Sequence, residues 1–507
     1  MTIVSALTPS VASRSEMVAS VLPPVVPEAA RLAALGSGLG LIWLSRSLGR
    51  RQHRAWLLAV ALVVATATAH LIKGLDFEEA AASALVCAAL IRYRRHFDVP
   101  GDPAAIKPLL VTAFALASAG GFLTFYALHR LQAPEDLEDL LTAAVVVFSV
   151  RSLYLWLRPW TEAVHVSVAQ RRLAHRLVSR YGRDSLAFFA LRQDKSYFFS
   201  PSRDAFLAYR VVGGSALISG DPIGDRTEFP ALVEEFRRVA HARGWRLAVL
   251  GASGELVALY RSLGLRVVKL GDEAVVRPDE FSLEGRPIRK VRQSVHRLRR
   301  AGYRVRVLRA EQIDSLFRAE LDAVSHEWLG SWPERGFTMA MDDLYSAAEP
   351  VFAVAQDAQG RIGGFLHLVP MPAARGYSVG AMRRRRSTPN GLMEFLIVEA
   401  LAWAERERVS QVSLNFCVFA DLLRAGCDRS RVGRAAGFAV QKLDRVFQLK
   451  RLLTFSDKFF PEWEPRYVCF ERFADVPGVG LAYLRLESLL TPPGPWTKRP
   501  RTGAAEA

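Results

Sequence analysis

The sequence predicts a bundle of membrane-spanning helices followed by a soluble α/β region made of two successive units of similar plan. Two observations predict this fold class. Long apolar stretches are concentrated before about residue 160, whereas apolar and charged residues interleave after it. In the later part, stretches typical of strands alternate with stretches typical of amphipathic helices, and this order occurs twice.

The composition excludes several classes of protein. Half of the 507 residues are hydrophobic, so a disordered chain is excluded. The four cysteines show neither a disulfide pattern nor ligand spacing, and we expect no metal and no cofactor. Lys and Arg number 67 against 50 Asp and Glu, a formal net charge of +17. This excess predicts an anionic partner, either lipid head groups or nucleic acid, and composition does not choose between them.

Five stretches in the N-terminal region are candidate membrane spans. A bilayer core requires about 20 mostly apolar residues per helix. The two clearest candidates are Trp56–Ile72 and Pro108–Leu128, and the weaker ones are Ala29–Leu44, Phe77–Ile91 and Leu140–Leu157. We therefore predict a transmembrane region of about five spans over residues 28–160.

The connections between these spans alternate in charge. Basic residues collect around 46–54, 92–107 and 158–172, and acidic residues around 76–79 and 135–139. The positive-inside rule places the basic connections in the cytoplasm. Five spans then place the protein in the cell membrane, multi-pass, with its C-terminal domain in the cytoplasm. Residues 1–27 lack the pattern of a cleavable signal peptide and are predicted to be a flexible lead-in.

The soluble region divides into two α/β units, 161–285 and 301–490. Their expected strands include Ala187–Leu191, Ala205–Val212 and Gln411–Asn415, and their expected helices include Glu228–Arg243 and Met393–Arg408. A basic helix over 286–300 joins the units. The Pro-, Gly- and Lys/Arg-rich tail, 491–507, is expected to be disordered.

The connecting helix is amphipathic. Val291, Val295 and Leu298 form its apolar face. Its predicted anion-binding residues are Arg289, Lys290, Arg292, Arg297, Arg299 and Arg300. Phosphates of tRNA or of lipid are the candidate ligands, and a merely solvated surface is the alternative.

A second basic cluster, Arg383–Arg386, leads through Pro389-Asn390-Gly391 into a helix. A turn that opens into a helix N-terminus presents N–H donors to an anion. The alternative is an ordinary turn between a strand and a helix, in which Gly391 supplies an unusual φ.

Short motifs in the soluble region resemble those of a known family. They occur in order over about 165–485, and their joint order is more specific than any one of them. The motifs are Gly220-Asp221-Pro222-Ile223-Gly224, Tyr260 with Gly264-Leu265, Leu270-Gly271-Asp272-Glu273-Ala274, Phe281-Ser282-Leu283-Glu284-Gly285-Arg286, Glu334-Arg335-Gly336-Phe337, Met382-Arg383, Pro389-Asn390-Gly391, Glu394, Ser413-Leu414-Asn415-Phe416, Phe447-Gln448-Leu449, Lys458-Phe459 and Pro461-Glu462-Trp463-Glu464-Pro465-Arg466-Tyr467. The chain thereby resembles the aminoacyl-phosphatidylglycerol synthases, the multiple-peptide-resistance family that includes lysyl-phosphatidylglycerol synthase.

The resemblance implies a catalytic domain of two tandem GNAT-like acyltransferase folds joined by the basic helix, the second of them catalytic. It also implies transfer of an amino acid, with lysine favoured, from aminoacyl-tRNA to a hydroxyl of phosphatidylglycerol or a related anionic phospholipid. Lysine would make the lipid cationic, which repels antimicrobial peptides. Some relatives carry a lysyl-tRNA synthetase domain after this region, and here we expect a separate synthetase to supply charged tRNA.

The resemblance and the chemistry of transesterification together suggest the site residues. We predict Arg383, Lys458 and Glu394 as catalytic residues, since the reaction needs proton transfer and stabilisation of an oxyanion. The predicted substrate-binding residues are Asn390, Gly391, Asn415, Arg466, Tyr467 and Asp221.

One position departs from the family pattern. Members read Asp-x-Met-Arg where this chain has Gly380-Ala381-Met382-Arg383. Because this carboxylate is missing, one alternative is a catalytically degenerate membrane protein that binds anionic lipid or tRNA. An acyl-CoA-dependent GNAT enzyme is another, although Arg386-Ser387-Thr388-Pro389-Asn390-Gly391 lacks the glycine spacing of a pyrophosphate loop.

Overall fold

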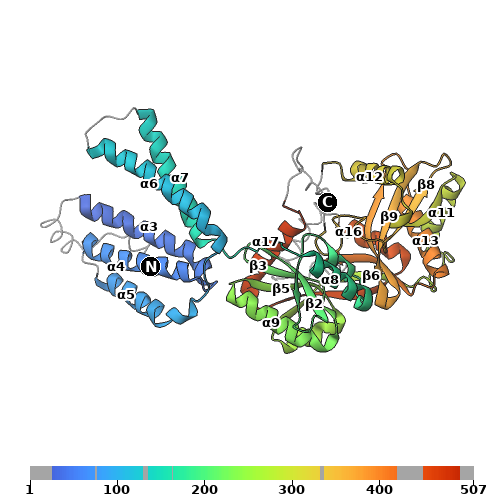
Figure 1. Ribbon diagram of the computed structural model, residues 1–507, viewed down its shortest axis with the longest axis horizontal. Coiled ribbons are helices and arrows are strands. Elements are labelled where there is room, and N and C mark those ends of the chain that lie inside the picture. The colour runs from blue at the N-terminus through green and yellow to red at the C-terminus, as the bar shows by residue number, and fades with distance from the viewer. Residues whose placement is uncertain are drawn as a thin grey trace. The chain divides into compact units, whose positions relative to one another are not determined.

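The chain divides into two compact units. The computed structural model describes residues 25–74, 77–128, 135–162, 164–331, 336–418 and 449–490. One unit contains residues 1–162 and 238–245, and the other contains 163–237 and 246–507 (Figure 1). The predicted tail, 491–507, and all but the last three residues of the predicted lead-in, 1–27, lie outside the described residues.

The first unit is helical. Its helices are α3 (Val25–Leu48), α4 (His53–Gly74), α5 (Phe77–Arg92), α6 (Ile106–Leu128) and α7 (Glu135–Leu157), with short 3-10 turns η1 (Arg94–His96) and η2 (Pro103–Ala105). Helix α4 packs against α3 and α5, and α6 packs against α7. Small side chains allow the helices to approach closely, because Ala55 and Ala59 of α4 are buried with Leu44 and Leu157. Ser152 Oγ donates a hydrogen bond of 3.1 Å to Thr112 Oγ1, which links α7 to α6.

A helix lies at each of the five predicted spans, but three helices of the described residues are long and apolar enough to cross a membrane. These are His53–Ile72, Pro103–Phe122 and Asp139–Leu157. Helix α5 has 16 residues and is therefore about 24 Å long, shorter than a hydrocarbon core of about 30 Å. In α3 the apolar helix found among the described residues is Leu35–Ser45, which is also shorter than a span. The five-span count stays a prediction.

The second unit is a mixed α/β structure. Its helices are α8 (Val168–Tyr181), α9 (Phe229–Ala242), α10 (Val257–Ser262), α11 (Arg289–Arg300), α12 (Ser315–Leu329), α13 (Leu392–Arg406), α16 (Leu449–Ser456) and α17 (Val476–Leu486). Its strands are β1 (Ser196–Phe199), β2 (Ala205–Val212), β3 (Ser215–Ser219), β4 (Ile223–Gly224), β5 (Arg246–Ser253), β6 (Arg266–Val276), β7 (Arg304–Arg309), β8 (Val351–Gln356), β9 (Ile362–Met371), β10 (Gly376–Arg384), β11 (Gln411–Val418) and β12 (Glu462–Phe470). Short 3-10 turns connect them, among them η3 (Phe188–Leu191) and η8 (Asp457–Phe459).

All twelve strands belong to one sheet, in the order β1-β2-β3-β5-β12-β6-β11-β10-β9-β8-β7, with β4 paired to β2. The described strands pair antiparallel except β3 with β5 and β10 with β11. A parallel pair needs a crossover connection, and α9 and α13 provide the two crossovers. The plan β2-β3-α9-β5 therefore returns as β9-β10-α13-β11, which is the similarity between the units that the sequence predicts.

The two halves of this sheet exchange their last strands. Strand β6, which ends the first half, pairs with β11 of the second half. Strand β12, near the end of the chain, pairs with β5 of the first half and with β6. Because each half contributes a strand to the ladder of the other, separating them would break main-chain hydrogen bonds on both sides.

The two faces of the sheet are covered differently. On one face α11 and α13 bury a large core, and Val412 and Leu414 of β11 point into it. The alternate residue, Ser413, points to the other face, where α8 and η3 pack. Along β12, Trp463 faces the α13 side, whereas Glu464 and Arg466 face the α8 side. Val291, Val295 and Leu298 are buried under the basic helix, so its predicted apolar face is confirmed.

The predicted strand Ala187–Leu191 is wrong, because this segment forms a turn and the 3-10 helix η3. Asp184 Oδ1 accepts a hydrogen bond of 2.8 Å from the Leu186 backbone N–H and so starts the turn. Phe188 and Phe189 are buried beside α8, and their apolar character comes from this packing rather than from pairing in the sheet.

The second unit also buries a lysine. The Nζ of Lys195 donates hydrogen bonds to Phe189 O at 2.8 Å and Ser219 Oγ at 2.6 Å, and it lies 4.7 Å from the centre of the Phe337 ring. Burial, with a contribution from the charge of Arg192, lowers the pKa of Lys195 to about 7. A neutral Lys195 amine needs fewer hydrogen-bond acceptors at this buried position than a charged ammonium would.

The buried lysine predicts a pH dependence of stability. Between pH about 7 and about 10 the unfolded chain holds a proton on Lys195 that the folded chain has released, so the free energy of unfolding rises with pH in this window. We expect the Lys195→Met variant to show a smaller rise than the wild type. Denaturant unfolding of both proteins across this range measures the difference, and parallel curves would contradict it.

Candidate functional site

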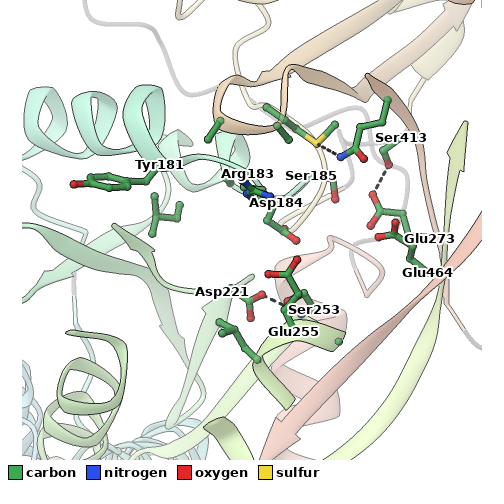
Figure 2. A pocket seen from close by; sticks show the side chains of 18 of the residues that line it. Tyr181, Arg183, Asp184, Ser185, Asp221, Ser253, Glu255, Glu273, Ser413 and Glu464 are labelled. Atoms are coloured by element: carbon green, nitrogen blue, oxygen red, sulfur yellow. Dashed lines mark hydrogen bonds between the residues drawn. The ribbon is translucent and has the colours of Figure 1, made fainter. Parts of the chain in front are cut away.

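An open cleft of about 1090 Å³ lies on the α8 side of the sheet. Its lining comes from the C-terminal end of α8, the segment after β3, the end of β5, and strands β6, β11 and β12. The lining residues with polar side chains include Arg180, Tyr181, Arg183, Asp184, Ser185, Asp221, Arg226, Ser253, Glu255, Glu273, Arg277, Arg375, Gln411, Ser413, Glu464 and Arg466. Figure 2 labels Tyr181, Arg183, Asp184, Ser185, Asp221, Ser253, Glu255, Glu273, Ser413 and Glu464 among them. Both halves of the sheet contribute, because β12 and β6 meet beneath the cleft.

Arg466 is the centre of a buried ionic network at the cleft floor. Its side chain is 5% exposed, and its Nε donates to Glu273 Oε2 at 2.7 Å. Nη1 bonds to Asp184 Oδ2 at 2.5 Å and to Gly251 O at 3.3 Å, and Nη2 bonds to Ser185 Oγ at 2.8 Å. One guanidinium therefore fixes the α8–η3 loop, β5 and β6 relative to one another.

This network sets the ionisation of its carboxylates. Burial raises the pKa of Asp184, and the nearby Arg466 charge opposes the rise. Burial also opposes ionisation of Glu273, but the Arg466 charge and hydrogen bonds from Ser185 and Ser413 hold its pKa below the ordinary value. Glu273 is therefore the charged partner of Arg466 at neutral pH.

Asp221 forms the opposite side of the cleft. Its Oδ2 accepts a hydrogen bond of 3.1 Å from the Ser253 backbone N–H, and its Oδ1 accepts one of 2.9 Å from Tyr260 OH. Burial and the nearby charge of Asp184 raise the pKa of Asp221 to about 6. Tyr260 is buried beside it, and burial raises the pKa of its hydroxyl, so it remains a donor.

The charges of the cleft are unevenly distributed. Asp184, Asp221 and Glu273 lie inside with the buried Arg466. The exposed charged residues around them are mostly basic, namely Arg180, Arg183, Arg226 and Arg375, together with Asp225 and Glu255. A ligand that carries a cationic group at one end and phosphates near it would complement this arrangement. Among the described residues, no group of His, Cys, Asp and Glu is arranged to hold a metal ion.

Two of the sequence-predicted residues, Asp221 and Arg466, meet in this cleft. Tyr467 follows Arg466 on β12, pairs with Ala252 and Lys269, and is not among the lining residues. The other predicted residues lie around β10, its turn into α13, and η8. The structure therefore does not bring the predicted residues together at one site.

The turn that contains Asn390 and Gly391 contacts the basic helix. Arg297 Nη2 donates a hydrogen bond of 2.5 Å to Asn390 O. Gly391 has φ of +94°, and a Cβ there would lie 2.6 Å from Ser294 Oγ, so only glycine fits this position. Gly391 thus has the unusual φ expected of an ordinary turn between a strand and a helix. The Asn390 carbonyl accepts its hydrogen bond from Arg297 of the basic helix.

Glu394 and Lys458 form an ion pair. Lys458 Nζ, at η8, lies 2.8 Å from Glu394 Oε1 in the first turn of α13. Arg383 lies on β10 directly opposite Phe365 of β9. Asn415, with φ of +84°, donates from Nδ2 to Val379 O at 3.2 Å, just beyond the last paired residues of β10 and β11. It thereby bridges these parallel strands where their pairing ends.

Gly380 lies against a buried histidine. A Cβ at Gly380 would be 2.8 Å from His367 Nδ1 and 3.5 Å from Phe189. Burial, together with the charge of Arg383, lowers the pKa of His367 to about 3, so the imidazole is neutral. The side chain of His367 thus occupies the space into which a larger residue at position 380 would project.

The predicted anion-binding residues of α11 are mostly exposed. Arg289, Lys290 and Arg300 face solvent. Arg299 forms an ion pair of 2.8 Å with Glu399 of α13, and Arg292 donates to Leu283 O and Gly285 O. Three cations of this helix are therefore presented outward, while Arg292, Arg297 and Arg299 help to fix the helix on the sheet.

Sequence reasoning assigned no role to several residues of the cleft. Glu273, Tyr260 and Glu464 stand inside the family motifs, and Asp184 and Ser185 lie outside them. A signal was present in β12, where Glu462, Glu464 and Arg466 alternate with other residues and so share a face. Their partners come from distant segments and required the structure.

The second unit belongs to a class of domain that is known from lipid-modifying proteins. Residues 175–470 match the family model described as phosphatidylglycerol lysyltransferase, C-terminal. The match covers more than half of the chain, which therefore belongs to this family.

Two similar bacterial proteins agree with this assignment. The lysylphosphatidylglycerol biosynthesis bifunctional protein LysX of Rhodococcus jostii is 39% identical over 327 residues, which cover 62% of this chain and 29% of the relative. The chain thus matches less than a third of that relative's length. The protein of the same name from Mycobacterium tuberculosis H37Rv is 37% identical over 332 residues, 64% of this chain and 28% of the relative.

Solved structures share the fold. A C-terminal domain from Agrobacterium fabrum, provisionally named as part of a lysylphosphatidylglycerol synthetase, is 28% identical with a TM-score of 0.55, over 63% of this chain and 98% of that chain. The L-PGS structure from Bacillus licheniformis is 24% identical with a TM-score of 0.58, over 65% of this chain and 98% of that chain. The latter likeness concerns the fold alone.

Proposed function

We propose that this protein is a membrane-bound aminoacyltransferase that moves a lysyl group from lysyl-tRNA to a hydroxyl group of phosphatidylglycerol. Family membership over residues 175–470 supports lysyl transfer to this lipid. The charge of the cleft is the observation that carries the choice of donor. Its acidic side chains suit the ammonium groups of a lysyl ester, and the exposed arginines around it suit the phosphates of a tRNA end.

The reaction is a transesterification. The lipid hydroxyl oxygen attacks the ester carbonyl carbon, and the bond from that carbon to the tRNA ribose oxygen breaks. The proton of the hydroxyl passes to the ribose oxygen, so no cofactor is consumed. The ester is already activated, so the protein contributes chiefly by orienting the two substrates and by stabilising the oxyanion.

We assign the predicted catalytic roles to three side chains around β10 and α13. Arg383 would bind the developing oxyanion or a substrate phosphate. Lys458 and Glu394, joined at 2.8 Å, would exchange a proton with the reacting hydroxyl or hold the amino group of the donor. Asn390, Gly391 and Asn415 would bind substrate beside them.

Further parts of the proposal concern architecture and location. The repeated plan of β2-β3-α9-β5 and β9-β10-α13-β11 supports two tandem GNAT-like units. The exposed cations of α11 support binding of tRNA or anionic lipid. The three long apolar helices support a multi-pass membrane anchor, and the basic connections support a cytoplasmic location for the catalytic unit. The product would carry a more positive head group than phosphatidylglycerol.

The experiment that tests this function uses the purified full chain in vesicles of phosphatidylglycerol. With lysyl-tRNA labelled in the amino acid, we expect the label to enter a lipid whose mass equals phosphatidylglycerol plus one lysyl residue. Vesicles of phosphatidylcholine, which has no free glycerol hydroxyl, serve as the control. If no amino-acid-bearing lipid forms with any charged tRNA tested, the proposed function is wrong.

A further inference from the structure

Glu464 differs from the other acidic side chains of the cleft in having no partner of its own. Asp184 and Glu273 are bound to Arg466, Asp221 to Ser253 and Tyr260, and Glu255 to Arg226. Among the residues that the structure describes, Glu464 makes no hydrogen bond or ion pair. It is an exposed residue of the cleft wall, on the face of β12 that carries Arg466.

Its nearest acidic neighbour is directly across the ladder. Glu464 of β12 is the register partner of Glu273 of β6, so two carboxylates stand opposite each other on one face. Figure 2 shows both side chains together on one wall of the cleft, with Asp221, Ser253 and Glu255 on the other side. Like charges in this position repel each other and destabilise a sheet.

The Arg466 guanidinium relieves this repulsion only in part. Its hydrogen bonds go to Glu273, Asp184, Ser185 and Gly251, and none of them goes to Glu464. Burial, followed by the charge of Glu273, raises the pKa of Glu464 above the ordinary value, although the charges of Arg466 and Arg277 oppose the rise. An added cation beside Glu464 would therefore be favourable, whereas an added neutral group would gain nothing from it.

We propose that Glu464 is the specificity-determining residue of the cleft, binding the side-chain ammonium of a lysyl donor and so distinguishing it from neutral aminoacyl groups. This inference rests on the proposed function for its choice of ligand. Among the described residues Glu464 has no direct ion-pair partner, which the ammonium would supply, whereas Glu273 is already paired with Arg466. Asp221 on the far wall adds a second acceptor for the same aminoacyl group.

A binding measurement on the purified full chain tests the assignment. The probes are L-lysine methyl ester and L-norleucine methyl ester, which share a chain of the same length but differ in the terminal ammonium. We expect ligand-observed NMR to show that the wild type binds the lysine ester more tightly. Glu464→Gln should weaken lysine ester binding by about 10- to 100-fold, as for loss of a charged hydrogen bond, and leave norleucine ester binding unchanged.

Glu462→Gln is the matched control. Glu462 lies two residues earlier on the same strand, is paired with Arg277, and is outside the cleft lining, so its change removes the same charge without touching the proposed contact. Glu464→Asp keeps the charge and should retain part of the preference. In the transfer assay, Glu464→Gln should raise KM for lysyl-tRNA more than it lowers kcat.

The outcomes distinguish the role of Glu464 from the proposed transfer of a lysyl group to phosphatidylglycerol. Equal binding of the two esters by the wild type overturns the role of Glu464, even if the variant fails to fold. Equal loss in Glu464→Gln and Glu462→Gln also overturns it, because the effect would then be a general change of charge. If the lysine ester binds through Glu464 but no lysyl lipid is formed, the recognition site stands and the transfer reaction does not.

Discussion

The Arg466→Met variant is expected to lose about 3–5 kcal/mol of unfolding free energy, the cost of removing one partner from a buried ion pair. Methionine fills much of the same volume but leaves Glu273 and Asp184 without the guanidinium that now binds both. The bonds to Ser185 and Gly251 are lost as well, so the α8–η3 loop loses its side-chain link to β12, whereas β5 keeps its main-chain pairing with that strand. Thermal and denaturant unfolding of the purified full chain measures the loss.

A control arginine separates burial from charge. Arg277 also lines the cleft, but its ion pair with Glu462 is exposed, at 33% and 57% of the two side chains, and Arg277→Met should cost less than about 1 kcal/mol. Comparable small effects of the two variants would show that the Arg466 network contributes little to stability.

The deficit of Arg466→Met should also depend on pH. In the wild type, Glu273 has a lowered pKa, so the stability that it contributes is lost as the pH falls through that range. In the variant, burial without a counter-charge raises the pKa of the same carboxyl above its unfolded value, so protonation favours the folded state. The effect in the variant reduces the difference between the two proteins as the pH falls from about 7, and the effect in the wild type reduces it further below the ordinary glutamate pKa of 4.5.

Local patterns were sufficient for most elements of the second unit. The basic helix was predicted from the spacing of Val291, Val295 and Leu298, all of which are buried. The strand Ala205–Val212 agrees at both ends with β2, and the helix predicted at Glu228–Arg243 agrees with α9 to within one residue at each end. In these segments the periodicity of burial is visible in the sequence itself.

Strand β12 could not be predicted in the same way. Four of its nine residues, Glu462, Glu464, Pro465 and Arg466, are charged or lack a backbone donor, features that argue against an interior strand. It lies in the middle of the sheet because the halves exchange their last strands, a pairing between residues some 200 apart in sequence, as with Trp463 and Ala274. Its charged face is stabilised because Arg466 forms ion pairs with Asp184 and Glu273. Both partners are far from β12 in the sequence, so no local sequence pattern predicts these contacts.

The candidate site was predictable in its residue types but not in its grouping. Asp221 and Arg466 were predicted as substrate-binding residues and line one cleft. Glu394 and Lys458 were predicted from separate motifs and form one ion pair. The register between β6 and β12 could not be predicted from the sequence. This register places Glu464 of β12 directly opposite Glu273 of β6.

Arg383→Ala is expected to reduce formation of the lysylated lipid by about 100-fold or more, the effect of removing one group that stabilises an oxyanion. The Arg383 side chain is partly buried on β10, near the neutral His367. Because position 380 is glycine, no carboxylate from that position competes for its charge. Membrane insertion and the melting temperature should remain close to those of the wild type. Mass spectrometry of lipids and the initial rate with lysyl-tRNA together measure the loss.

Arg386→Ala is the matched control for this prediction. Arg386 belongs to the same run of arginines, but its side chain is exposed and its contact with Glu327 uses the backbone N–H, which alanine retains. We expect this variant to keep at least about half of the wild-type rate, since an exposed charge of this kind contributes little more than steering. If product levels are unchanged in Arg383→Ala, Arg383 is not part of the reaction centre, and Lys458 is the remaining cation among the proposed catalytic residues.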